Sequence, residues 1–335
     1  MMPNIAKGFF DGIELMDDTH LLISDWVTFP VKGFGKFWIY DLKTQTSKTI
    51  LSEESPADIF YDRNTFKIYI PQMLHNRVEI TSVEGLIKNS NNLNAIKYDR
   101  VYQYGLINAF LGGLYKGTLP IAELKFKGDF GLGAPDMVNG ELTMNNGKMY
   151  QTTYTGETKE IFDSAKTSMA FVSFFKADTS FRSSRIQSKE QALKYINSLL
   201  ANKNGMYSIR ISGMYDYIKT RAFSPVEKNP SPALSTLLKQ QHFFEFRKTQ
   251  GVLVGYKLAD FMNGINIPGY HFHFISDGKE GGGHVIDLTW NNVLIEIQEL
   301  HEFSIDVPQT SDYRQFDFKN IGLDDLKKVE NGGGN

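Results

Sequence analysis

The chain has 335 residues, more than one average domain, and its 36 basic and 38 acidic side chains give a formal net charge of -2. A near-neutral chain without a basic stripe interleaved with aromatic residues does not have the composition of a nucleic-acid-binding protein. No apolar run reaches about eighteen residues, so no membrane-spanning helix is predicted.

Two further features of the composition concern location. Residues 1–7 lack the apolar segment of a signal peptide, which predicts a cytoplasmic protein. The chain has no cysteine, and this fits either an oxidising or a reducing compartment.

Residues 1–85 contain a weak internal repeat. Asp11-Gly12-Ile13 is echoed by Ala57-Asp58-Ile59, and the segment 21–26 is echoed by 67–73, with an offset of 46 or 47 residues. That offset is close to the length of a propeller blade of four short strands. The segment therefore resembles the last blades of an SMP-30/gluconolactonase-like β-propeller, and the expected structure is about two propeller-like β-blades.

This second resemblance supports an alternative function, that of a metal-dependent lactonase or sugar-binding protein of propeller type. Propellers close with four to eight blades, so two blades leave a metal site at the ring centre incomplete. Glu14, Asp25 and Asn76 are therefore interpreted as structural rather than catalytic. Residues 1–85 are interpreted as an accessory or vestigial interaction segment whose open strand edges must be covered by other parts of the chain or by a partner.

The remaining chain divides by composition. Residues 86–98 are polar and rich in asparagine, which predicts a linker. The main region follows at 99–310, and 311–335 form a polar C-terminal tail.

Three helices are predicted in the main region. One covers 101–115 despite two glycines. A second covers 188–202, where Ser188 and Gln191 form a capping box before an amphipathic stripe. A third starts after Ser231-Pro232 and covers 233–241.

Strands dominate elsewhere, and the class is α+β, β-rich, with antiparallel pairing. The predicted strands are 206–212, 214–221, 251–256, 270–275, 284–288 and 293–297.

Three of the seven histidines, His271, His273 and His284, lie within fourteen residues. Side chains alternate along a strand, so His271 and His273 project from the same face. Residues 277–283 are rich in glycine and predict a hairpin that returns His284 alongside them. Three imidazoles with a fourth position open to water or substrate are typical of a catalytic zinc site.

Other interpretations of the histidines stay open. They could be hydrogen-bonded core or surface side chains. A cupin would also use a His-x-His strand, but Asp277 and Glu280 are poorly spaced to provide its acidic ligand. Copper, iron or nickel could replace zinc among three imidazoles.

Four segments agree in order and spacing with a known family. They are 102–110 with 128–133 and 139–141, then 219–222, 268–284 and 301–303. From about Val101 onwards, over roughly 230 residues, the chain resembles α-acetolactate decarboxylase. The resemblance implies an acetolactate decarboxylase-like fold of two β-sheet subdomains with the metal between them, and a homodimer.

The implied reaction is the zinc-dependent decarboxylation of 2-acetolactate to acetoin. Loss of carbon dioxide leaves charge on the neighbouring ketone, and zinc acting as a Lewis acid would stabilise the resulting enediolate. The chain has neither a glycine-rich dinucleotide motif nor a P-loop, so no organic cofactor is expected. By resemblance, His271, His273 and His284 hold the zinc.

The same resemblance implies three catalytic residues, each with a structural alternative. Glu141 matches the active-site glutamate of a Gly-Glu pair and would act as an acid; otherwise it is an exposed hairpin residue. Arg221 matches an arginine that would clamp the substrate carboxylate; otherwise it lies on a strand surface. Glu330 is placed by its spacing from residues 301–303, in a tail that returns to the active site; otherwise it is a solvated helical charge. Ala134 stands where some relatives have threonine, which puts one hydroxyl contact in doubt.

Overall fold

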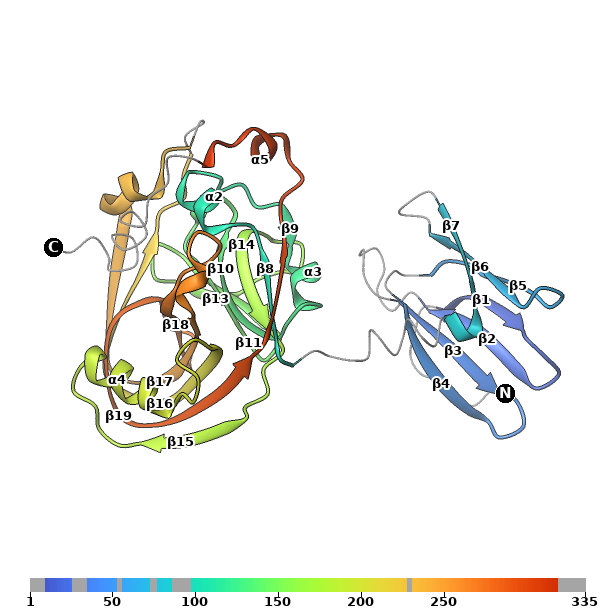
Figure 1. The fold of residues 1–335 in the computed structure, drawn as a ribbon, viewed down its shortest axis with the longest axis horizontal. Coiled ribbons are helices and arrows are strands. Elements are labelled where there is room, and N and C mark those ends of the chain that lie inside the picture. Colours follow the sequence, from blue (N-terminus) through green and yellow to red (C-terminus); the bar gives the residue numbers. More distant parts are fainter. Residues whose placement is uncertain are drawn as a thin grey trace. The chain divides into compact units, whose positions relative to one another are not determined.

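The computed structural model describes residues 10–25, 35–52, 56–72, 77–85, 98–227 and 231–318. The chain forms two compact units, unit 1 (residues 1–96) and unit 2 (residues 97–335) (Figure 1). Each unit has hydrophobic clusters of its own. Within the described ranges, no helix has the length and apolar character needed to cross a membrane.

Unit 1 contains two small antiparallel sheets. One consists, in chain order, of β1 (Phe10–Leu15), β2 (His20–Asp25), β3 (Gly35–Asp41) and β4 (Thr46–Ser52). The other consists of β5 (Phe60–Asp62), β6 (Lys67–Gln72) and β7 (Arg77–Ser82). Buried side chains of both sheets share one core made of Leu22, Phe37, Ile50, Ile59, Tyr61, Ile68 and Ile70.

This arrangement does not support the propeller expected from the repeat. In a propeller the sheets surround a central channel, whereas the described residues of unit 1 form two small sheets that share a core. The lactonase or sugar-binding alternative loses its structural basis with the propeller. Asp25 is buried in β2 and accepts a hydrogen bond from Trp38 Nε1 at 3.2 Å. Glu14 lies in β1, and Asn76 lies outside the described residues.

Unit 2 is built on two larger sheets. The first has eight strands in the order β13-β12-β11-β10-β14-β8-β20, with β9 also paired to β14. All of its pairs are antiparallel except β20 with β8, which is parallel. The strands are β8 (Arg100–Tyr104), β9 (Leu119–Pro120), β10 (Phe130–Pro135), β11 (Glu141–Asn145), β12 (Lys148–Thr152), β13 (Thr158–Glu160), β14 (Lys166–Ser173) and β20 (Glu302–Asp306).

The second sheet has five strands in the order β15-β19-β16-β17-β18, and β18 also pairs with β19. The pairings of β16 to β19 therefore close on themselves. The strands are β15 (Thr179–Ser183), β16 (Met206–Phe223), β17 (Gln241–Leu258), β18 (Gly269–Ser276) and β19 (Gly282–Leu300).

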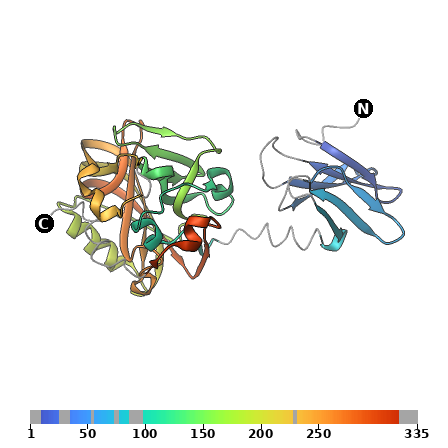
Figure 2. The same ribbon diagram turned by 90° about the horizontal axis from the view of Figure 1, so that it is seen from above.

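The two faces of this second sheet pack differently. One face packs with helix α4 (Lys189–Leu199), and we call this cluster the α4-side core; Ile211, Phe274 and Leu288 are among its members. Figure 2 shows α4, in yellow-green, along the outside of the orange strands. The other face, with Val254 and Tyr256, packs in a core that includes Phe130 and Leu132 of the eight-stranded sheet. The functional side chains lie on this second face.

The helix predictions have mixed outcomes. The N-cap at Ser188 is confirmed, because its side chain accepts a hydrogen bond from Gln191 N. The Gln191 side chain accepts from the backbone N–H of Gln187 rather than from that of Ser188. The helix predicted over 101–115 is largely wrong: residues 100–104 pair in the sheet as β8, and Gly105 turns the chain with φ +76° before a single helical turn. The helix predicted over 233–241 is a 3-10 helix. That 3-10 helix is η3 (Leu234–Gln240). Other short helices of unit 2 are α2 (Ile107–Leu111), α3 (Ile121–Lys125), α5 (Ser311–Gln315), η2 (Asp136–Val138) and η4 (Asp260–Met262).

The β-rich α+β class is confirmed, but the strands are longer than predicted. The ranges 206–212 and 214–221 belong to one strand, β16, which runs through Gly213. The ranges 284–288 and 293–297 likewise belong to β19. Between Met214 and Tyr217 the pairing register of β16 with β19 shifts, and the shift interrupts the alternation of side chains between the two faces. The strand itself continues through this segment.

Candidate metal centre

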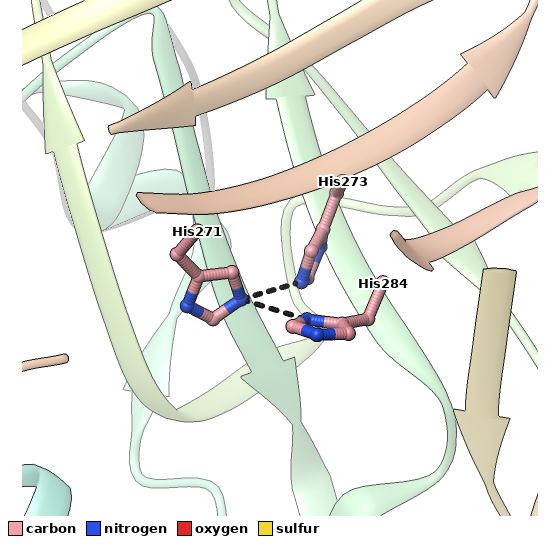
Figure 3. Close-up of side chains that lie close together, drawn as sticks. All are labelled: His271, His273 and His284. Atoms are coloured by element: carbon pink, nitrogen blue, oxygen red, sulfur yellow. Dashed lines mark hydrogen bonds between the residues drawn. The ribbon is translucent and has the colours of Figure 1, made fainter. Parts of the chain in front are cut away.

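The structure brings His271, His273 and His284 together, as strand alternation and the predicted hairpin require. The first two lie on β18, and His284 on β19 is the direct partner of His273. His271 Nε2 lies 3.2 Å from His273 Nε2 and 3.0 Å from His284 Nδ1 (Figure 3). All three side chains are buried. The alternative of surface histidines is therefore excluded.

The surroundings keep these imidazoles neutral. Burial, assisted by the positive charge of Arg221, lowers the pKa of His271 to about 3. Burial likewise lowers the pKa of His273 and of His284 well below the usual value. His273 Nδ1 lies 2.8 Å from the carbonyl oxygen of Leu142, which can only accept, so Nδ1 carries the proton and Nε2 keeps its lone pair. Neutral imidazole is the form that binds a metal ion.

The spacing of the three nitrogens fits a metal ion. Ligand nitrogens about 2.0–2.1 Å from a tetrahedral zinc lie about 3.3 Å from one another. The two nitrogen separations at His271, 3.2 and 3.0 Å, are close to that value. Within the described ranges, this is the one group of three or more histidine or carboxylate side chains whose possible ligand atoms all lie within 4.8 Å of one another.

Glu141 and Arg221 form a buried ion pair beside the histidines. Arg221 Nη1 donates to Glu141 Oε1 at 2.5 Å, and the other carboxylate oxygen lies 3.6 Å from His273 Nε2. Arg221 lies opposite His284 in the register of β16 and β19, so the two side chains share a face. Glu141 begins β11 of the eight-stranded sheet. The two sheets of unit 2 therefore both contribute to the site.

The turn before Glu141 depends on glycine. Gly140 has φ +91°, and a Cβ atom there would lie 2.0 Å from the carbonyl oxygen of Thr152. Its N–H donates to the carbonyl oxygen of Phe223, two residues after Arg221, at 3.0 Å. This bond fixes the start of β11 against the end of β16. The glycine of the Gly-Glu pair thus has a structural role.

A pocket with about 550 Å³ of space, its open mouth included, lies over the histidines and the ion pair. Its polar lining is formed by Glu141, Arg221 and the three histidines. Its apolar lining includes Ile107, Phe110, Met169, Phe171, Phe223 and Ala134. Ala134 therefore lies at the pocket, where a threonine hydroxyl would have added a polar contact.

Other residues of the site were not predicted. Thr143 Oγ1 lies 3.3 Å from His273 Nδ1, and Phe110 and Met169 line the pocket. These residues lie far in sequence from the histidines, so no pattern around the histidine segment predicts that they reach the site. Glu330, which the resemblance placed here, lies outside the described residues.

Comparison with known proteins identifies the family. Residues 101–320 match the family described as Alpha-acetolactate decarboxylase. The chain belongs to this family. Over 230 residues it is 32% identical to the Alpha-acetolactate decarboxylase of Brevibacillus brevis, a match that covers 69% of the chain and 80% of the relative. The enzyme of that name from Raoultella terrigena is 32% identical over 255 residues, covering 76% and 98%.

A solved structure agrees with this family assignment. The X-ray structure of alpha-acetolactate decarboxylase from Bacillus subtilis strain 168 superimposes with a TM-score of 0.66 and 28% identity, and the match covers 70% of this chain and 100% of that chain. The residues that match the acetolactate decarboxylase family lie within unit 2. They contain Glu141, Arg221 and the three histidines.

Proposed function

We propose that this protein catalyses the zinc-dependent decarboxylation of 2-acetolactate to acetoin, as a carboxy-lyase. The observation that carries the proposal is one pocket in which three buried neutral imidazoles face a glutamate–arginine ion pair. Family membership over residues 101–320 supports the same reaction.

Zinc is the proposed metal, held by His271, His273 and His284. When bound, it would supply a Lewis acid for the charge that develops on the substrate oxygens. Three imidazoles and an open fourth position are the donor set of catalytic zinc sites, whereas structural sites are closed. The chain's lack of cysteine fits the catalytic kind.

Arg221 is the proposed clamp for the substrate carboxylate. A guanidinium presents a planar fork of donors that fits two oxygens, and Arg221 is held at the pocket by its bond to Glu141. Decarboxylation breaks the bond between this carboxylate and the neighbouring carbon, and the electron pair stays on the substrate. Apolar walls, including Phe110 and Met169, would pack on the methyl groups and keep water out.

Glu141 is the proposed acid. The carbon that loses carbon dioxide must gain a proton to give acetoin. The Glu141 carboxylate, paired with Arg221 and beside His273, would take up a proton from solvent and deliver it to that carbon. Delivery from one fixed side would give acetoin of a single configuration. Glu330 is proposed as a second glutamate of the site, brought by the tail 311–335.

We propose a cytoplasmic homodimer that acts on a small molecule and neither on nucleic acid nor at membranes. Residues 99–310 would be the catalytic domain, 86–98 a linker, and 1–85 an accessory segment.

The test is acetoin formation from racemic 2-acetolactate by the purified full-length chain. We expect activity that disappears after chelator treatment and returns with zinc, with one acetoin enantiomer in excess. Folded, zinc-loaded protein that forms no acetoin would refute the proposed function.

A further inference from the structure

Strand β19 contains one extra residue two positions after the third histidine. Lys219 of β16 pairs with Asp287, but Thr220, the next residue, pairs with Val285. Ile286 is therefore the additional residue of a β-bulge. Bulges change which way the neighbouring side chains point, and they often lie beside active sites.

The bulge decides which face His284 occupies. Leu288 belongs to the α4-side core. In a regular strand, every second side chain shares a face, so residue 284 would point into that same apolar core. Instead Val285 joins the α4-side core, and His284 faces the pocket, opposite Arg221 and His273. The third imidazole thus reaches its partners because of the extra residue.

Lys189 binds this bulge from the first turn of α4. Its Nζ donates to the carbonyl oxygen of Ile286 at 2.9 Å and to that of Val285 at 3.4 Å. A bulge disrupts the ladder of hydrogen bonds locally, so its carbonyl groups need other donors. An ammonium group has three donors and no acceptor, which suits two adjacent carbonyls.

The helix that carries Lys189 is held in place by contacts that do not involve the lysine amine. Ser188 caps α4, and Ala192 and Ile196 pack in the α4-side core. The amine is therefore carried on a fixed helix that would stay in place without it. Removal of the amine should therefore affect the position of His284 without unfolding the protein.

We propose that Lys189 is a positioning residue for the metal centre: it holds the bulge at Ile286 in the form that turns His284 towards His271 and His273. The inference rests on the proposed metal site but not on the identity of the substrate. Lys189 acts through the backbone next to the ligand and touches neither metal nor substrate.

The test compares the full-length chain with three variants. Lys189→Met keeps the aliphatic stem and removes the amine, and Lys189→Arg keeps a cationic donor. Lys194→Met is the matched control, because Lys194 is an exposed lysine of the same helix. Zinc affinity is measured by competition with a chromogenic chelator. The visible absorption of the cobalt(II)-loaded protein reports the ligand geometry, and the melting temperature of the metal-free protein reports its folding.

We expect Lys189→Met to weaken zinc binding roughly 10–100-fold, as loss of an outer contact to a ligand commonly does, and to change the cobalt spectrum. Lys189→Arg should recover most of the affinity, and Lys194→Met should match the wild type. Should Lys189→Met not fold, Lys189→Gln is the second neutral variant, with the same expected direction.

Two results would overturn the inference. Wild-type zinc affinity and an unchanged cobalt spectrum in the folded neutral variant would show that Lys189 does not position His284. An arginine variant as defective as the methionine variant would show that the cationic donor is not what matters. Wild-type protein that binds neither metal would instead refute the proposed metal centre itself.

Discussion

The two units use antiparallel sheets in different ways. The shared core of unit 1 is apolar or aromatic throughout, and its described residues contain no group of three metal-binding side chains. Unit 2 also has large apolar cores, but it buries three histidines, Arg221 and Glu141 on one face. Buried polar groups are stable only when they are paired or bind a partner. The difference indicates that unit 2 is organised around a chemical site, whereas the described shared core of unit 1 is made of apolar and aromatic side chains.

The largest expected effect is loss of a ligand. His273→Gln should abolish tight zinc binding and essentially all acetoin formation, because two imidazoles remain and the His273–Leu142 contact is lost. Metal content and initial rates check this. His301→Gln, at an exposed histidine, is the control. If His273→Gln kept full activity, the buried histidine cluster would have no chemical role, and the proposed difference between the two units would be wrong.

Glu141→Gln should lower the rate about 10²–10⁴-fold while zinc remains bound, because the positioned proton donor is lost. It also leaves Arg221 buried without its partner charge, so folding is checked by circular dichroism. Glu157→Gln, at an exposed glutamate, is the control. Unchanged turnover by the folded variant would return Glu141 to a purely structural role.

Arg221→Lys should lower kcat/KM on the order of 10–100-fold, corresponding to about 1.5–3 kcal/mol for a hydrogen bond to a charged group. A lysine keeps the charge but cannot present two parallel donors. Steady-state kinetics with 2-acetolactate measure the loss. Arg247→Lys, at an exposed arginine of the same sheet, should have no effect. Equal losses in the two variants would refute the clamp.

Acid should destabilise unit 2 through its histidines. Because burial lowers the pKa of His271 from 6.5 to about 3, the unfolded chain binds a proton between these values that the folded chain excludes. The free energy of unfolding is therefore unaffected by this group above pH 6.5. As the pH falls from 6.5 towards 3, it decreases by up to about 1.4 kcal/mol per pH unit. Urea unfolding of the metal-free protein at several pH values measures this slope. His271→Gln should show a shallower slope, and an equal slope would contradict the assignment.

The smallest effect on catalysis is expected in unit 1. Leu22 is fully buried, so Leu22→Ala should cost about 2–5 kcal/mol of unfolding free energy there. Because unit 1 has a separate core, thermal unfolding should show one transition shifted and the other unchanged. Acetoin formation and zinc content should stay at wild-type values. A parallel loss of activity would show that the two units are energetically coupled.

The sequence predicted local features better than distant ones. The histidine strand, its hairpin and the Ser188 cap depend on residues close in sequence, and the structure contains all three features. The first four residues of the helix predicted at 101–115 belong to β8 instead, because pairing with β14 outweighs local propensity. The ion pair between Glu141 and Arg221 joins residues 80 positions apart, and no local pattern shows such a contact.

Two structural details of the site also lay beyond the sequence. The bulge at Ile286 appears only once the register with β16 is known, and so does the contact of Lys189. Val138, a β-branched residue of the pocket lining, adopts φ +58°, which local propensity opposes. Both features depend on packing around the site rather than on a motif.

The most direct test of the account is a titration of metal-free protein with zinc while acetoin formation is followed. We expect activity to rise linearly and to reach a plateau at one zinc ion per chain, and His273→Gln to show no rise. Full activity in the metal-free protein, or a zinc-independent rate equal in both proteins, would contradict the account.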